Sequence, residues 1–89
     1  MGDDAAKKKF EETKAKAEKG DKIAQHKLGV MYHIGEGVPR DVKEAAKWFR
    51  KAAEQGFAAA QYNLGVMYAN GEGVPKDDVT AYAWYNIAA

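Results

Sequence analysis

The chain contains no cysteine, no serine and only two prolines. Without cysteine it has neither a disulfide nor a thiolate metal site. Without cysteine and serine it also lacks two common catalytic nucleophiles. No apolar run approaches the roughly 18 residues of a membrane-spanning helix, and no basic-then-apolar signal segment begins the chain. We therefore expect no membrane partner, and these absences leave the localisation unknown.

The charge of the chain is balanced overall but unevenly distributed. The formal net charge is +1 over 89 residues, a length that allows one small domain. After Ala52 the chain has one basic residue, Lys76, against Glu54, Glu72, Asp77 and Asp78. This asymmetry is too weak for nucleic acid, which requires a basic stripe or a pI above about 9. It is the kind of asymmetry that orients head-to-tail association.

A duplication dominates the sequence. The stretch LGVMYHIGEGVPRD (28–41) returns as LGVMYANGEGVPKD (64–77), 36 positions later and without a gap. A fixed period of this size is typical of stacked structural repeats. The positions that repeat and that we expect to hold the structure are Ala24, Leu28, Gly29, Tyr32, Gly35, Gly37 and Trp48 in the first copy, and Ala60, Leu64, Gly65, Tyr68, Gly71, Gly73 and Trp84 in the second.

The apolar spacing and the turn residues predict five helices and no strand. We expect helices over 3–19, 22–34, 42–55 and 58–70, and from 78 to the end. Asp41 and Glu44 resemble a capping box, which we expect to be weaker in the second copy because Thr80 replaces the glutamate. Gly29 and Gly65 lie inside helices at a cost of roughly 1 kcal/mol each, which predicts a close approach of another helix there.

These elements divide the chain into an N-terminal helix (1–20), a first repeat (21–56) and a second, C-terminally incomplete repeat (57–89). The first segment is expected to be a cap or a degenerate half repeat. The core is predicted to bury Leu28, Tyr32, Trp48, Leu64, Tyr68 and Trp84. The last helix is apolar nearly all round, which favours burial. Either a longer array continues from it, or it pairs with another molecule.

The repeated pattern, with LG-x-MY, GxGV and W-[FY]-x-x-AA at constant spacing, resembles the Sel1-like repeat family, whose helix-turn-helix units are related to tetratricopeptide repeats. The resemblance covers about 17–89 in two copies. It implies an all-α, right-handed α-solenoid of 36-residue repeats, often bacterial, that acts as a non-catalytic protein-interaction scaffold. Cysteine-rich relatives staple each repeat with disulfides, and this chain departs from that branch.

Catalytic and cofactor chemistry find little support in the sequence. His26 and His33 lie seven residues apart, beyond the i, i+4 spacing of helical metal pairs. The Gly35-Glu36-Gly37 turn lacks the preceding strand and the third glycine of a dinucleotide-binding loop. We expect no enzyme activity, no metal and no cofactor.

The candidate binding surface follows from the resemblance, which implies that the first helix of each repeat lines the concave face. The candidate partner-binding residues there are His26, Val30, His33, Tyr62, Val66 and Ala69. Residues that recognise a ligand have no reason to repeat from one copy to the next. Two of these positions do differ between the copies: His26 corresponds to Tyr62, and His33 corresponds to Ala69. Drift on any exposed face gives the same pattern. The partner is expected to be a protein or peptide of unknown identity. Self-association through the apolar C-terminal helix, and a role as a regulatory or inhibitory subunit of an enzyme, stay open as alternatives.

Overall fold

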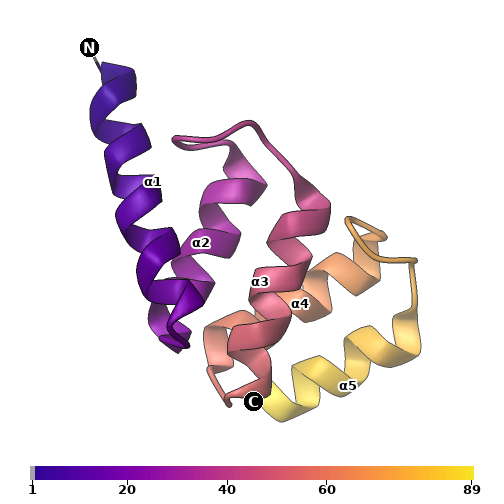
Figure 1. Cartoon of the computed structure of the whole chain (residues 1–89). Coiled ribbons are helices and arrows are strands. Elements are labelled where there is room, and N and C mark those ends of the chain that lie inside the picture. The colour runs from indigo at the N-terminus through magenta and orange to yellow at the C-terminus, as the bar shows by residue number, and fades with distance from the viewer. Residues whose placement is uncertain (1) are drawn as a thin grey trace.

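The computed structural model describes residues 2–89, which form five helices and no strand. The helices are α1 (Gly2–Glu18), α2 (Lys22–Ile34), α3 (Val42–Glu54), α4 (Ala58–Asn70) and α5 (Asp78–Ala88). Each helix packs on the next one along the chain, so that the helices form a row (Figure 1). The row is elongated, with extents of 43 × 22 × 16 Å. The all-α repeat solenoid is thus confirmed, and the helices end within about one residue of the predicted bounds.

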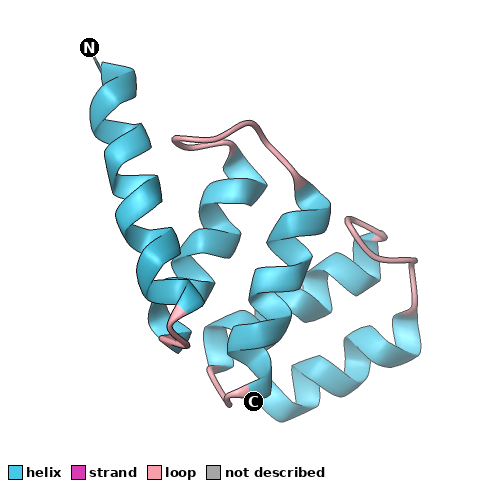
Figure 2. Cartoon of the chain, in the orientation of Figure 1, coloured by secondary structure: helices cyan, strands magenta, loops and turns pink. Residues whose placement is uncertain are grey.

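Short loops join the helices (Figure 2), and aspartates begin three of them. The side chain of Asp41 accepts hydrogen bonds from the backbone amides of Lys43 and Glu44, both at 3.1 Å. The reciprocal half of the predicted capping box is wrong. The amide of Asp41, which a capping box would satisfy with Glu44, instead donates to the carbonyl of Tyr32 at 2.9 Å. The returning loop brings that carbonyl to the amide, so the glutamate is not needed.

The second copy uses the same arrangement. The amide of Asp77 donates to the carbonyl of Tyr68 at 3.0 Å. Thr80 adds a hydrogen bond from its hydroxyl to the Asp77 carboxylate at 2.8 Å. The expectation of a weaker second cap is therefore not met, because threonine supplies a side-chain donor that the first copy does not use.

Contacts between successive repeats recur after one period. Gln25 and Gln61 are both buried. The side-chain amide of Gln25 donates to the carbonyl of Ala17 at 3.2 Å, and that of Gln61 donates to the carbonyl of Ala53 at 3.1 Å. Helix α1 therefore packs on α2 as α3 packs on α4, and it lies where the second helix of a preceding repeat would lie.

The loop of each hairpin also contacts the helix that precedes that hairpin, α1 for the first loop and α3 for the second. Gly37 and Gly73 have φ values of 75° and 72°. A Cβ on Gly37 would collide with the backbone carbonyl of Ala6, and one on Gly73 with that of Val42. A left-handed backbone conformation and a backbone-to-backbone contact thus coincide at both positions, and glycine satisfies both requirements.

Most of the predicted core is buried, with two exceptions. Leu28 and Leu64 are fully buried, and Tyr32 and Trp48 are buried, whereas Tyr68 and Trp84 are only half-buried. The ring of Phe10 covers Tyr32 edge-on at a centroid distance of 5.4 Å. The position one period after Phe10 is Ala46, which is too small to cover Tyr68 in the same way.

The mid-helix glycines mark close helix approaches, as predicted. A Cβ on Gly29 would lie 2.7 Å from the ring of Phe49, and one on Gly65 would lie 2.8 Å from the ring of Tyr85. The missing side chain therefore lets an aromatic ring of the second helix lie directly against the backbone of the first.

Replacing Gly73 by alanine should destabilise the fold more than the same change at Gly56. Gly56 also has positive φ, at 85°, but its Cβ would meet nothing within 4 Å. We expect Gly56→Ala to lower the free energy of unfolding by about 1–2 kcal/mol. Gly73→Ala should lower it by at least about 1 kcal/mol more, because the Val42 backbone must shift. Urea unfolding followed by circular dichroism measures both losses, and equal losses would contradict the proposed loop contact.

Candidate functional site

A groove opens between the first helices of the two repeats. It has a volume of about 370 Å³ and is lined by Val30, His33, Phe49, Asn63, Val66, Met67, Asn70 and Glu72. We call it the α2/α4 groove. Its apolar side chains are Val30, Phe49, Val66 and Met67, and its polar side chains are His33, Asn63, Asn70 and Glu72.

The apolar part of the groove depends on the close packing of the helices. Phe49 belongs to α3, and its ring lies against Gly29 of α2. The next residue along α2 is Val30, which lines the groove together with its counterpart Val66, one period later on α4. The groove is therefore assembled from both repeats and exists only when they are stacked.

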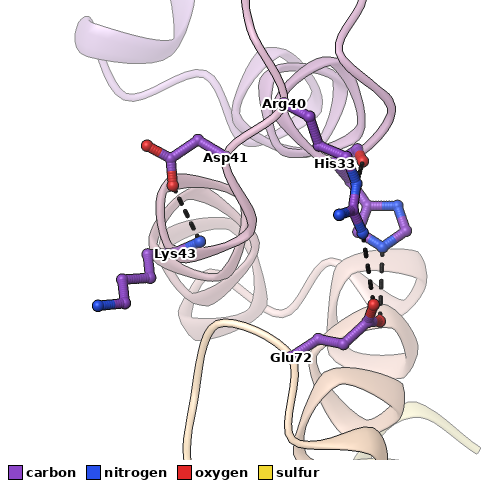
Figure 3. Close-up of polar contacts among 5 residues, drawn as sticks. All are labelled: His33, Arg40, Asp41, Lys43 and Glu72. Atoms are coloured by element: carbon purple, nitrogen blue, oxygen red, sulfur yellow. Dashed lines mark hydrogen bonds and ion pairs between the residues drawn. The ribbon is translucent and has the colours of Figure 1, made fainter.

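A polar cluster at one end of the groove joins the loops of the two repeats (Figure 3). The Glu72 carboxylate lies 3.6 Å from His33 Nε2 and 3.4 Å from Arg40 Nη2. The Arg40 Nε group donates to the carbonyl of His33 at 2.7 Å. The side chains of His33, Glu72 and Arg40 are 38%, 36% and 55% exposed, so these contacts stabilise the fold by at most about 1 kcal/mol.

His26 lies between the repeats. Its ring packs against Phe49 and Phe57 at centroid distances of 5.7 and 5.2 Å. Its Nε2 atom is hydrogen-bonded to the side-chain nitrogen of Asn63 at 2.9 Å. Burial lowers the pKa of His26 from its ordinary value of 6.5. The ring is therefore part of the inter-repeat packing, and it orients Asn63, which does line the groove.

The structure divides the six candidate residues among several places. Val30, His33 and Val66 line the α2/α4 groove together. Tyr62 is 57% exposed and lines a different hollow, beside Tyr85 of α5. Ala69 is half-buried and is not among the residues that line the groove.

Sequence reasoning left out five residues that line the groove, namely Phe49, Asn63, Met67, Asn70 and Glu72. Phe49 is a core residue, 3% exposed, that reaches the floor of the groove from α3. Glu72 belongs to a loop whose position depends on how the hairpins stack. The sequence signal that could have pointed to Asn63 is the comparison of the two copies. Asn63 takes the place of Lys27, so the charge changes at an equivalent position.

The described part of the chain shows no sign of two other kinds of function. Among the described side chains, those of residues 4–89, no group of three or more His, Cys, Asp or Glu residues is arranged to hold a metal ion. None of the described helices is both long and apolar enough to cross a membrane.

Stacked helical hairpins with a groove between their first helices define an α-solenoid repeat protein. The Sel1 repeat family model matches residues 22–57 and 58–89. The chain therefore belongs to the Sel1 repeat family, and the resemblance found in the sequence is confirmed. Sel1 repeats generally mediate protein–protein interaction, and the family is typically non-catalytic.

Solved structures resemble the chain closely. A protective antigen of uropathogenic Escherichia coli strains with an SLR fold is 50% identical, with a TM-score of 0.85 over 85% of this chain. A Sel1 repeat protein from Oxalobacter formigenes is 44% identical, with a TM-score of 0.77 over 79% of this chain. The chain spans only 16% and 29% of these two proteins.

A curated relative matches over a shorter stretch. The ERAD-associated E3 ubiquitin-protein ligase component HRD3B of Arabidopsis thaliana is 43% identical over 44 residues, which are 48% of this chain and 7% of that protein. The chain thus corresponds to a small part of each of these relatives.

The burial of His26 makes stability depend on pH. Because the pKa of His26 is lower in the folded than in the unfolded chain, the unfolded chain binds more protons near and below pH 6.5. The contribution of neutral His26 to the free energy of unfolding is therefore fully present above pH 6.5, and it is lost as the pH falls through the folded-state pKa. His26→Gln should flatten this dependence, as measured by urea unfolding between about pH 8 and pH 5. His33→Gln is the matched control. A wild-type-like slope in His26→Gln would show that the effect arises elsewhere.

Proposed function

We propose that the chain is a non-catalytic protein-interaction module that binds a segment of a protein partner in the α2/α4 groove. The observation that carries the proposal is a hollow in which Val30 and Val66, one from each repeat, are partly exposed above the buried Phe49 and Met67, with polar side chains at the edge. A site of this kind combines apolar contact area with a few polar groups that orient the ligand.

The size of the groove sets the kind of contact. A volume of about 370 Å³ lies at the small end of ligand pockets. It accommodates one or two side chains rather than a folded surface. Each buried aliphatic group contributes about 0.8 kcal/mol per methylene, against the cost of ordering the partner. We therefore expect a single groove to bind a short segment with modest affinity.

Three of the candidate residues, Val30, His33 and Val66, belong to this proposal directly. His26 belongs to it indirectly, because it holds Asn63 at the edge of the groove. The relative described as a component of a ubiquitin-ligase assembly supports a role of the same class.

A charged residue in the apolar part of the groove should abolish binding. We expect Val66→Lys to weaken binding of peptides selected from a random display library by at least about tenfold, because it removes apolar contact and introduces a charge. Fluorescence polarisation measures the affinity. Val79→Lys is the matched control, since Val79 is 80% exposed on α5 and outside the groove. If both variants bind like the wild type, the groove is not the binding site.

A second candidate function is association through the end of the row. An open apolar hollow of about 690 Å³ lies there and is lined by Tyr62, Tyr85, Ala58, Ala59, Ala88 and Ala89. On α5, Tyr82 and Ile87 are 66% and 59% exposed. We call this surface the α4/α5 end face. Exposed apolar side chains gathered in this way are typical of contact surfaces.

If the α4/α5 end face mediates self-association, Tyr62→Glu should abolish it, because the charge would be buried against Tyr85, whose ring lies 5.5 Å from that of Tyr62. Sedimentation equilibrium at increasing concentration measures the mass. Val79→Glu carries the same charge outside the hollow and should associate like the wild type. A wild-type chain that stays monomeric at every concentration would rule out self-association.

A further inference from the structure

We infer that the α2/α4 groove selects a long cationic side chain, lysine or arginine, of the partner segment. This inference rests on the proposed function and names the chemistry of the group that enters the groove. It follows from the acceptors along the groove, from its shape, and from a comparison with the equivalent hollow one repeat earlier.

Two polar side chains of the groove, Glu72 and Asn63, offer acceptors to a ligand. Glu72 is the acidic residue among those that line the groove, and its carboxylate lies 3.4 Å from Arg40 Nη2 at the groove's edge. Asn63 uses its side-chain nitrogen in the contact with His26, and its Oδ1 accepts no hydrogen bond from the described residues. A ligand that enters this site should therefore bring donors, and a cationic head group brings several.

The carboxylate of Glu72 is not saturated by its neighbours. Its oxygens lie 3.6 Å from His33 Nε2 and 3.4 Å from Arg40 Nη2, and its side chain is 36% exposed. Charge-assisted hydrogen bonds are shorter, at about 2.7–2.9 Å, and a carboxylate has about four acceptor positions. An incoming ammonium or guanidinium group can therefore form stronger bonds to Glu72 than the ones it already has.

The apolar part of the groove suits the stem of such a side chain. Val30, Val66 and Met67 line the same hollow as Glu72. Lysine and arginine carry three or four methylene groups that pack on apolar surface while the charged head reaches a polar edge. One residue of the partner can thus use both the apolar lining and the carboxylate.

The equivalent hollow between α1 and α2 has different chemistry. It is lined by Lys9, Thr13, His26, Lys27, Val30, Met31 and Glu36 and has a volume of about 220 Å³. Met31 and Glu36 correspond to Met67 and Glu72. However, Lys27 takes the place of Asn63, and Lys9 is a second cation that lines the hollow. These two ammonium groups disfavour a third cation in the earlier hollow, whereas Arg40 is the one cation paired with Glu72 in the α2/α4 groove among the described residues. We therefore expect the preference in the α2/α4 groove and not in the earlier hollow.

This difference supplies a matched pair of variants. Glu72→Gln removes the carboxylate from the α2/α4 groove, and Glu36→Gln makes the same change one repeat earlier. Both glutamates lie at loop positions that contact solvent. Both variants should keep the wild-type circular dichroism spectrum, and they change the net charge of the chain by the same amount.

The probe is a random heptapeptide display library selected on the immobilised whole chain. We expect the selected peptides to carry lysine or arginine. We expect their affinity to fall about tenfold on Glu72→Gln, the size of one charge-assisted hydrogen bond. It should change little on Glu36→Gln. A synthetic peptide in which norleucine replaces the cationic residue should show the same loss on the wild-type chain.

The other outcomes overturn the inference in distinguishable ways. Suppose that the selected peptides lose binding on Val66→Lys, yet bind Glu72→Gln as tightly as the wild type, or bind as tightly with norleucine as with the cationic residue. Either result would leave the proposed function in place and refute the cation preference. Equal losses on Glu36→Gln and Glu72→Gln would show general charge attraction instead of a site. If no selected peptide depends on Val66, the proposed function fails, and the inference fails with it.

Discussion

Backbone contact between each hairpin loop and the preceding helix determines how the repeats stack. Gly37 lies against the carbonyl of Ala6, and Gly73 lies against that of Val42. At the opposite end of each first helix, a buried glutamine donates a hydrogen bond to a carbonyl near the end of the helix before it. Gln61 of α4, for example, donates to the carbonyl of Ala53 in α3. Each first helix is therefore held at both of its ends. Because both contacts recur after 36 residues, every repeat adopts the same position relative to the one before it.

The groove is a consequence of this stacking. Val30 and Val66 lie 36 residues apart, and they line one hollow because α2 and α4 hold equivalent positions in successive repeats. Phe49 closes the hollow from α3, since Gly29 leaves room for its ring. The polar cluster of Glu72 with its neighbours is half exposed, and ion pairs of that kind stabilise a fold weakly. The packing thus holds the site together, whereas the charged residues set its chemistry.

The differences between the two copies are as informative as the identities. Ala46 follows Phe10 after one period, and Tyr68 is in consequence less covered than Tyr32. Asn63 takes the place of Lys27, so the lining of the α2/α4 groove lacks the lysine of the earlier hollow, and the cation beside Glu72 is Arg40 at the groove's edge. Identical residues at repeated positions keep the helices in register. Substitutions between the copies then give neighbouring surfaces of the same shape different charges and different exposure.

The sequence alone determined the period, the five helices, the aspartate caps and the close approach at Gly29, because each depends on residues near in the chain or on a repeat that needs no gap. It did not determine which side chains share the groove. His26 and Tyr62 are equivalent in sequence, yet His26 packs between Phe49 and Phe57 while Tyr62 is 57% exposed. Burial at such positions depends on which helix lies next in the stack. Likewise, Glu72 reaches His33 only after the loop of the second repeat is brought against α2 of the first. Contacts between residues far apart in the chain follow from tertiary packing, and no local pattern encodes them.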